Sequence, residues 1–441
     1  MSAVPEALRG AKPGSRLRFP PWGALGVVLF GLGLWALVAD VEAWNTVWYL
    51  PAWYGYLLVL DSVISLRGGR SFVVERRGEL LSMMLWSLPF WLLFEAFNLR
   101  LHNWSYVFGL RTLWGSFLMS TLAFATVLPA CFFHAELLDA FGAFRGRRWR
   151  PLAVGRGVLA LCAAAGAAAV VLPLLRPTEF FWIVWGAPLG ILEVVNYRSG
   201  APSLLSDLER GDPGRLLRLL AGGALAGAAW ELLNYWARTK WIYTVPGFER
   251  GKILEMPFAG FGGFPPLALS GFAFHSFVSN LRGRSRLAAI ALAVAFSVVA
   301  GAAALERNVQ SIRPVLSDLP LDASAVAKLR AAGIPTPERL DRAVRREGLT
   351  AVASRSGVSA DALEHAATEA SLALHKGMGA PAARLLEAAG IRDVAELARA
   401  DPDELAARLA RVAAERGQVP PRPEFVRVWV RAARPDGRPR R

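Results

Sequence analysis

Nine apolar blocks fill the first 305 residues of the chain, and each is close to the length that crosses a lipid bilayer. A transmembrane helix needs about 20 apolar residues, and the bilayer core leaves no unpaired backbone groups, so blocks of this length predict helices. The sequence therefore predicts an all-α fold: a polytopic transmembrane bundle of eight or nine spans over residues 20–305. The blocks lie at about 20–40, 46–66, 79–99, 113–138, 152–175, 179–197, 215–236, 256–280 and 286–304.

Arginine and lysine gather in every second loop between these blocks. In a soluble protein the net charge of +15 would suggest a nucleic-acid partner, but here it predicts membrane orientation. Basic loops face the cytoplasm, so we expect a cytoplasmic N-terminal segment, residues 1–19, in a bacterial-type plasma (inner) membrane. The basic set is Arg9, Lys12, Arg16, Arg18, Arg67, Arg70, Arg76, Arg77, Arg145, Arg147, Arg148, Arg150, Arg198, Arg210, Arg215, Arg218, Arg282, Arg284 and Arg286.

The side of the membrane that holds the C-terminal region stays open at this point. Nine spans place it outside, whereas a re-entrant Gly/Pro-rich stretch at 258–266 would leave eight spans and a cytoplasmic tail. One loop on the opposite side, with Arg238, Lys240, Arg250 and Lys252, breaks the charge trend.

The membrane part contains an internal repeat, with copies at about 20–138 and 152–280 and a closing helix at 286–304. Trp53 and Asp61 match Trp185 and Glu193 at the same spacing. Each copy holds four spans, an even number, so we expect two parallel four-helix repeats with shared sites between them. Further along, Glu95, Asn98, Trp104 and Tyr106 match Glu231, Asn234, Trp241 and Tyr243.

Acidic side chains interrupt the apolar blocks. A charge at the bilayer centre costs roughly 3 kcal/mol on insertion scales, so such residues are candidates for function. Glu95 and Asn98 share one helix face, as do Glu231 and Asn234, and an Asn amide can donate to a carboxylate. The candidate intramembrane polar residues are Asp61, Glu95, Asn98, Glu193, Glu231, Asn234 and Glu255.

Two interpretations of these acids compete. In the first, the carboxylates converge on a cavity between the halves and bind a cation, relay protons or stabilise a cationic intermediate. In the second, Glu95 and Glu231 join the halves by hydrogen bonds, while Asp61 and Glu193 pair with loop arginines such as Arg67. The aromatic residues Trp104, Tyr106, Trp241 and Tyr243 follow their spans, and either form an interface belt or line the mouth of the cavity.

Part of the second copy resembles the small helical lycopene cyclases of carotenoid synthesis. The resemblance rests on the order of Asn234, Trp241, Tyr243, Gly251 and Glu255-Met-Pro257. It implies acid-catalysed chemistry on a polyene. Those enzymes carry Pro-x-Glu-Glu, whereas this chain has one acid, placed before the proline.

Residues 316–412 form short helices separated by glycines and resemble helix-hairpin-helix modules, closest to an uncharacterised family with tandem units. In DNA-binding members a glycine hairpin offers backbone N–H groups to phosphate, helped by basic side chains. The residues that match this hairpin are Lys376, Gly377, Gly379 and Arg384. The resemblance leaves a protein partner for 316–412 and a nucleic-acid partner as alternatives. Residues 413–441 read as a basic tail.

Three functions remain open from the sequence. The first is a non-enzymatic bundle that handles an ion or a small lipophilic ligand, or acts as a scaffold, with a C-terminal docking domain. The others are an isoprenoid cyclase and a membrane tether for DNA. The sequence assigns no catalytic residue and predicts no cofactor and no metal site, because Cys131 and Cys162 are the only cysteines and both lie in apolar blocks.

Overall fold

The computed structural model describes residues 19–39, 44–245 and 251–434. Within these, eight helical segments are long and apolar enough to cross a membrane. The N-terminal part therefore has the helices of a multi-pass membrane protein, as the apolar blocks predict. The segments are Pro21–Val38 (α1), Tyr49–Leu66 (α3), Arg77–Leu101 (α4), Leu113–Ala140, Arg156–Leu175 (α7), Pro177–Ser199, Gly214–Trp236 (α11) and Gly283–Arg307 (α13).

Two of the eight segments are broken helices. Leu113–Ala140 consists of α5 (Leu113–Phe124) and α6 (Val127–Ala140). Pro177–Ser199 consists of α8 (Pro177–Phe180), the 3₁₀ turn η2 (Phe181–Gly186) and α9 (Leu189–Ser199). Short helices α2 (Trp44–Val47) and α10 (Leu204–Glu209) lie in loops.

The eighth apolar block, at about 256–280, contains a 3₁₀ turn, η3 (Phe258–Gly263), that leads directly into α12 (Phe264–Asn280). At 17 residues and a rise of about 1.5 Å per residue, α12 is short for a span. Residues 258–266 form η3 and the first turn of α12. Helix α12 packs against α11 and α9 and leads to the start of α13.

A small sheet closes one end of the bundle. Strand β1 (Trp104–Val107) follows α4, and β2 (Lys240–Tyr243) follows α11; the two pair antiparallel. Residues 308–312, after α13, add to the other edge of β1 through the parallel bridges Tyr106–Val309 and Gly109–Ile312. A second two-stranded ribbon, β3 (Lys252–Ile253) with β4 (Met256–Pro257), lies between β2 and η3.

The C-terminal region is helical and has two apolar cores. One core contains Leu329 and Leu363, and the other contains Leu386 and Trp429. The elements are η4 (Leu316–Asp318), α14 (Ala323–Ala331), α15 (Pro337–Glu347), α16 (Leu349–Ser356), α17 (Ala360–Leu374), η5 (His375–Gly377), α18 (Ala380–Ala388), α19 (Val394–Arg399), α20 (Pro402–Glu415) and α21 (Pro423–Ala433).

The predicted basic tail at 413–441 differs from the structure over most of its described length. Helix α20 continues to Glu415, and α21 places Phe425 and Trp429 fully inside the second core. In the sequence, arginines are interspersed among the apolar residues of α21. The apolar face is visible only when the residues are placed at helical spacing.

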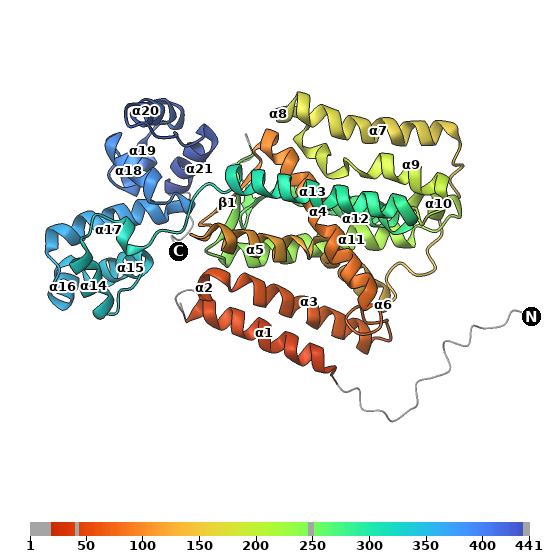
Figure 1. The fold of residues 1–441 in the computed structure, drawn as a ribbon, viewed down its shortest axis with the longest axis horizontal. Coiled ribbons are helices and arrows are strands. Elements are labelled where there is room, and N and C mark those ends of the chain that lie inside the picture. Colours follow the sequence, from red (N-terminus) through yellow and green to blue (C-terminus); the bar gives the residue numbers. More distant parts are fainter. Residues whose placement is uncertain (1–18, 40–43, 246–250, 435–441) are drawn as a thin grey trace, which may run out of the picture.

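The C-terminal helices sit against the sheet end of the bundle (Figure 1), where β1 is labelled beside the blue domain. Val107 of β1 and Ile242 of β2 belong to the same apolar cluster as Met378 and Phe425 of the domain. The sheet therefore has the membrane bundle on one face and the C-terminal domain on the other.

Candidate functional site

Glu95, in the last third of α4, accepts four hydrogen bonds although it is fully buried. Its Oε1 accepts from the indole Nε1 of Trp91 at 3.0 Å, the indole Nε1 of Trp104 at 3.0 Å and the hydroxyl of Tyr106 at 2.6 Å. Its Oε2 accepts from the side-chain amide of Asn308 at 2.6 Å. All four neighbours are donors, which fits an ionised carboxylate because an ionised carboxylate only accepts.

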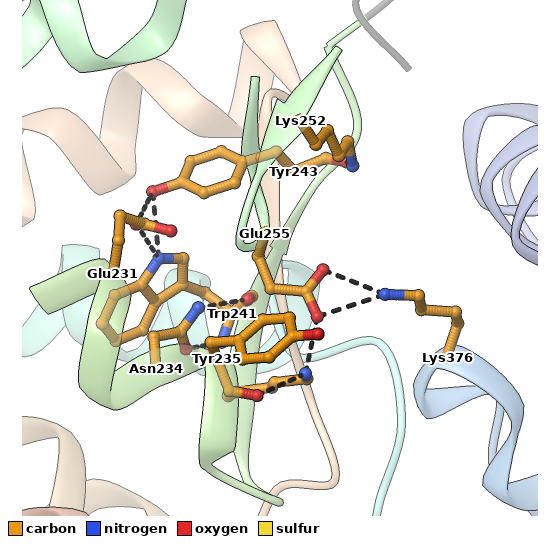
Figure 2. Close-up of polar contacts among 9 residues, drawn as sticks. Glu231, Asn234, Tyr235, Trp241, Tyr243, Lys252, Glu255 and Lys376 are labelled. Carbon is orange, nitrogen blue, oxygen red and sulfur yellow. Dashed lines mark hydrogen bonds and ion pairs between the residues drawn. The ribbon is translucent and has the colours of Figure 1, made fainter. Parts of the chain in front are cut away.

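Glu231, in α11, is the matching residue of the second copy and binds the matching Trp and Tyr of its strand. Its Oε1 accepts from the indole of Trp241 at 3.1 Å and from the hydroxyl of Tyr243 at 2.7 Å (Figure 2). Burial, and then the adjacent carboxylate, raise the pKa of Tyr106 and of Tyr243 well above its ordinary value. Both phenols therefore remain hydroxyl donors over the physiological pH range.

The asparagine of each copy fixes the start of the strand. Asn98 donates to the carbonyl of Trp104 at 2.8 Å and accepts from the backbone N–H of Asn103 at 2.9 Å. Asn234 donates to the carbonyl of Trp241 at 2.9 Å and accepts from the N–H of the same residue at 3.0 Å. The Glu-x-x-Asn face thus holds a Trp-x-Tyr strand by its backbone as well as by its side chains.

The pairing of β1 with β2 obeys a two-fold symmetry between the two copies of the repeat. Trp104 pairs with Tyr243, and Tyr106 pairs with Trp241, so exchanging the copies maps each pair onto the other. A local two-fold axis through the Ser105–Ile242 pair produces this arrangement. The carboxylates do not share a donor among the described residues, so they form two neighbouring clusters instead of one joint site.

The copies differ at the second carboxylate oxygen. Oε2 of Glu231 is buried and has no hydrogen-bond partner among the described residues, whereas Oε2 of Glu95 binds Asn308. The indole of Trp91 also has no counterpart, since Gly227 stands in its place and the Phe264 ring fills the space. A Cβ at Gly227 would lie 2.0 Å from that ring.

The aromatic residues of the strands point inward, and the interface-belt interpretation is wrong for this reason. Trp104 is buried and stacks on Trp185 with ring centroids 5.6 Å apart. Trp241 meets Tyr49 edge to face at 5.9 Å. Their polar tips bind carboxylates, and their rings pack in the bundle core.

Asp61 and Glu193 lie apart from these clusters and hold loops. Asp61 accepts from the hydroxyl of Ser71 at 2.5 Å and from the N–H of Phe72 at 2.7 Å. Glu193 accepts from the N–H of Leu205 at 3.1 Å. The expected pairing with loop arginines is not what holds Asp61, because Arg67 lies over the ring of Phe141 instead.

Glu255 connects the bundle to the C-terminal domain (Figure 2). Its carboxylate, 2% exposed, binds Lys240 of β2 at 2.6 Å and Lys376 of η5 at 3.1 Å through each oxygen. Burial alone would raise the pKa of Glu255, but the charges of Lys240 and Lys376 outweigh burial and lower this pKa to about 2. The group is therefore a fixed anion at neutral pH.

The residues expected to bind phosphate are engaged inside the molecule. Ser311 donates to the carbonyl of Gly377 at 2.5 Å, and the N–H of Gly379 donates to the carbonyl of Ala373 at 2.8 Å. Arg384 donates to the carbonyl of Asp318 at 2.9 Å and lies 3.3 Å from Glu369. Gly377 packs so closely on Val107 that a Cβ there would lie 2.3 Å from the Val107 Cβ.

Sequence reasoning missed Asn308 and Ser311 as members of the site. Trp91 is four residues before Glu95, and this spacing already places it on the same helix face. Asn308 is 213 residues away from Glu95. No local pattern links those two.

The geometry defines a class of protein: a bundle of candidate membrane spans that carries a helical C-terminal domain on a small sheet. Residues 321–435 match a family described as a domain of unknown function, DUF4332. The C-terminal region is thus a DUF4332 domain, which confirms the expected uncharacterised family and extends it beyond residue 412. Comparison with curated proteins finds no match, and comparison with solved structures finds none.

Proposed function

We propose that this protein is a non-enzymatic membrane scaffold that holds its DUF4332 domain against one end of a duplicated helical bundle. The observation that carries the proposal is the contact at Glu255, where a buried carboxylate of the bundle binds Lys376 of the domain. Burial of Gly377 on Val107 and a hydrogen bond from Arg422 to Ser105 at 2.7 Å extend the same contact.

The duplicated carboxylates support the platform for this docking. Glu95 and Glu231 bind the inward side chains of β1 and β2, while Ser105, Val107 and Ile242 of the same strands contact the domain. Successive side chains of a strand point to opposite faces, so each cluster fixes the surface presented to the domain.

Acid catalysis of the cyclase type receives less support from the site. A general acid must carry a proton at the working pH, and two lysines keep Glu255 ionised. Four donors surround the Glu95 carboxylate, an arrangement that suits an ionised carboxylate more than a proton donor.

Binding of DNA by the hairpin also receives less support. A phosphate would need free N–H groups and an accessible lysine. Here Gly377 is buried, the N–H of Gly379 is hydrogen-bonded, and Lys376 binds Glu255.

Amide hydrogen exchange tests the docking contact in the full-length protein in lipid nanodiscs. We expect Lys376→Met, which removes the charge and keeps the stem, to raise exchange at β1 and β2 roughly tenfold, or about 1.4 kcal/mol. Lys376→Glu should raise it further, because a second carboxylate would face Glu255.

Lys328→Glu is the matched control. Lys328 is another lysine of the domain, and it donates to the carbonyl of Gly357 within the domain, so exchange at the strands should not change. Unchanged exchange in both Lys376 variants would refute the proposed docking function.

A further inference from the structure

A groove of about 480 Å³ runs between α4, α5 and α13. Most of its lining is apolar and comes from three of the candidate spans, which places the groove within the membrane. Several of its lining side chains are largely exposed in the protein alone, including Leu85 at 70% and Val298 at 60%. Surfaces of this kind in a bilayer contact lipid chains instead of water.

The groove extends along most of the bilayer depth. At one end it is lined by Gly78 and Arg286, near the starts of α4 and α13. At the other end it reaches Tyr106 and Val309, beyond the ends of those helices. Helix α13 has 25 residues, or roughly 37 Å at 1.5 Å per residue, which is enough to cross the hydrocarbon core.

The two ends of the groove differ in polarity. Arg286 is exposed, forms no ion pair within the described ranges, and lies at the arginine-rich end of the bundle with Arg282 and Arg284. The far end is closed by Tyr106, whose hydroxyl already donates to Glu95. One end therefore offers a free cation at the membrane surface, and the other, beside the sheet, offers an aromatic ring.

We propose that this groove binds one anionic phospholipid, with its phosphate at Arg286 and an acyl chain lying along the groove toward Tyr106. Apolar walls select a hydrocarbon chain, and a juxtamembrane arginine attracts an anionic headgroup. A neutral isoprenoid would fit between the apolar walls of the groove equally well, but it would leave Arg286 without a partner. The site is independent of the docking contact, since it shares no residue with Glu255, Lys240 or Lys376.

The test measures phospholipid retained by the purified full-length protein, by native mass spectrometry after reconstitution with equal phosphatidylglycerol and phosphatidylcholine. Wild type should retain one phosphatidylglycerol per chain. Ala293→Phe, which fills the groove, should abolish retention of that lipid. Ala291→Phe is the matched control: Ala291 is on the same helix but does not line the groove, so retention should persist.

A second pair of variants tests whether Arg286 binds the lipid headgroup. This test does not depend on whether Ala293→Phe folds. Arg286→Gln should lower phosphatidylglycerol retention about tenfold, while Arg284→Gln, outside the groove, should leave it unchanged. Equal retention of the two lipids by wild type would overturn the proposal. So would retention that is the same in Arg286→Gln and Arg284→Gln.

Discussion

Two buried glutamates bind matching Trp-x-Tyr strands but have different surroundings at both carboxylate oxygens. Burying an ionised carboxylate costs several kcal/mol, which only good donor geometry offsets. Glu95 recovers this cost through four donors, and Glu231 through two. The stability of the two clusters should therefore respond differently to loss of the charge.

We expect Glu95→Gln to lower the free energy of unfolding by roughly 1.5–3 kcal/mol, the range for hydrogen bonds to charged groups. Glu231→Gln should cost less, because its new amide would lie where Oε2 now has no partner. In Glu95→Gln that amide would face Asn308, which must turn its own amide to accept. The measurement is the apparent unfolding temperature by tryptophan fluorescence.

Glu306→Gln serves as the control, because Glu306 is exposed at the end of α13 and should tolerate the change. An equal or larger loss for Glu231→Gln would show that donor number does not decide the stability of these clusters.

At the scale of elements, β1 and β2 connect both parts of the molecule. Trp104 and Tyr106 face the bundle, while Ser105 and Val107 face the domain, and β2 alternates in the same way. The hairpin element η5 meets this surface through a glycine with φ of 72°. The backbone shape of η5 at this point, more than the charge of η5, requires a glycine.

Gly377→Ala should separate the domain from the sheet, because its Cβ would collide with Val107 and its backbone is left-handed. Gly390→Ala is a matched control: its φ is 83°, but nothing lies within 4 Å of the new Cβ. Both changes cost about 1–2 kcal/mol for the backbone. Only Gly377→Ala should speed amide exchange at β1 and β2.

Equal exchange in the two glycine variants would mean that contact with Val107 is not what holds the domain. Exchange within α17 and α18 reports separately whether the domain itself remains folded.

Local patterns made some of these elements predictable. Apolar length was enough for α4, α11 and α13, and helical spacing linked Glu95 to Asn98. The pairing of β1 with β2 was not predictable, because each strand has four residues and its partner lies in the other copy. Docking was also beyond prediction, since Glu255 and Lys376 are 121 residues apart.

At the scale of the whole molecule, the C-terminal domain lies at the end of the bundle opposite the arginine-rich loops (Figure 1). Helices α4, α11 and α13 start beside those loops and end beside the sheet or the domain. The loop that breaks the charge trend has a separate explanation. Arg238 pairs with Glu338 of the domain at 3.0 Å, and Lys240 binds Glu255.

These two cations serve docking, so the remaining basic loops alone should set the orientation. We therefore predict that the DUF4332 domain is outside the cytoplasm. Alkaline phosphatase fused after residue 441 should be active, and green fluorescent protein at the same position should be dark. Fusions after Arg148, in an arginine-rich loop, should give the reverse result. A fluorescent protein that glows at residue 441 would place the domain in the cytoplasm, and would reverse the proposed orientation without affecting the contact between Glu255 and Lys376.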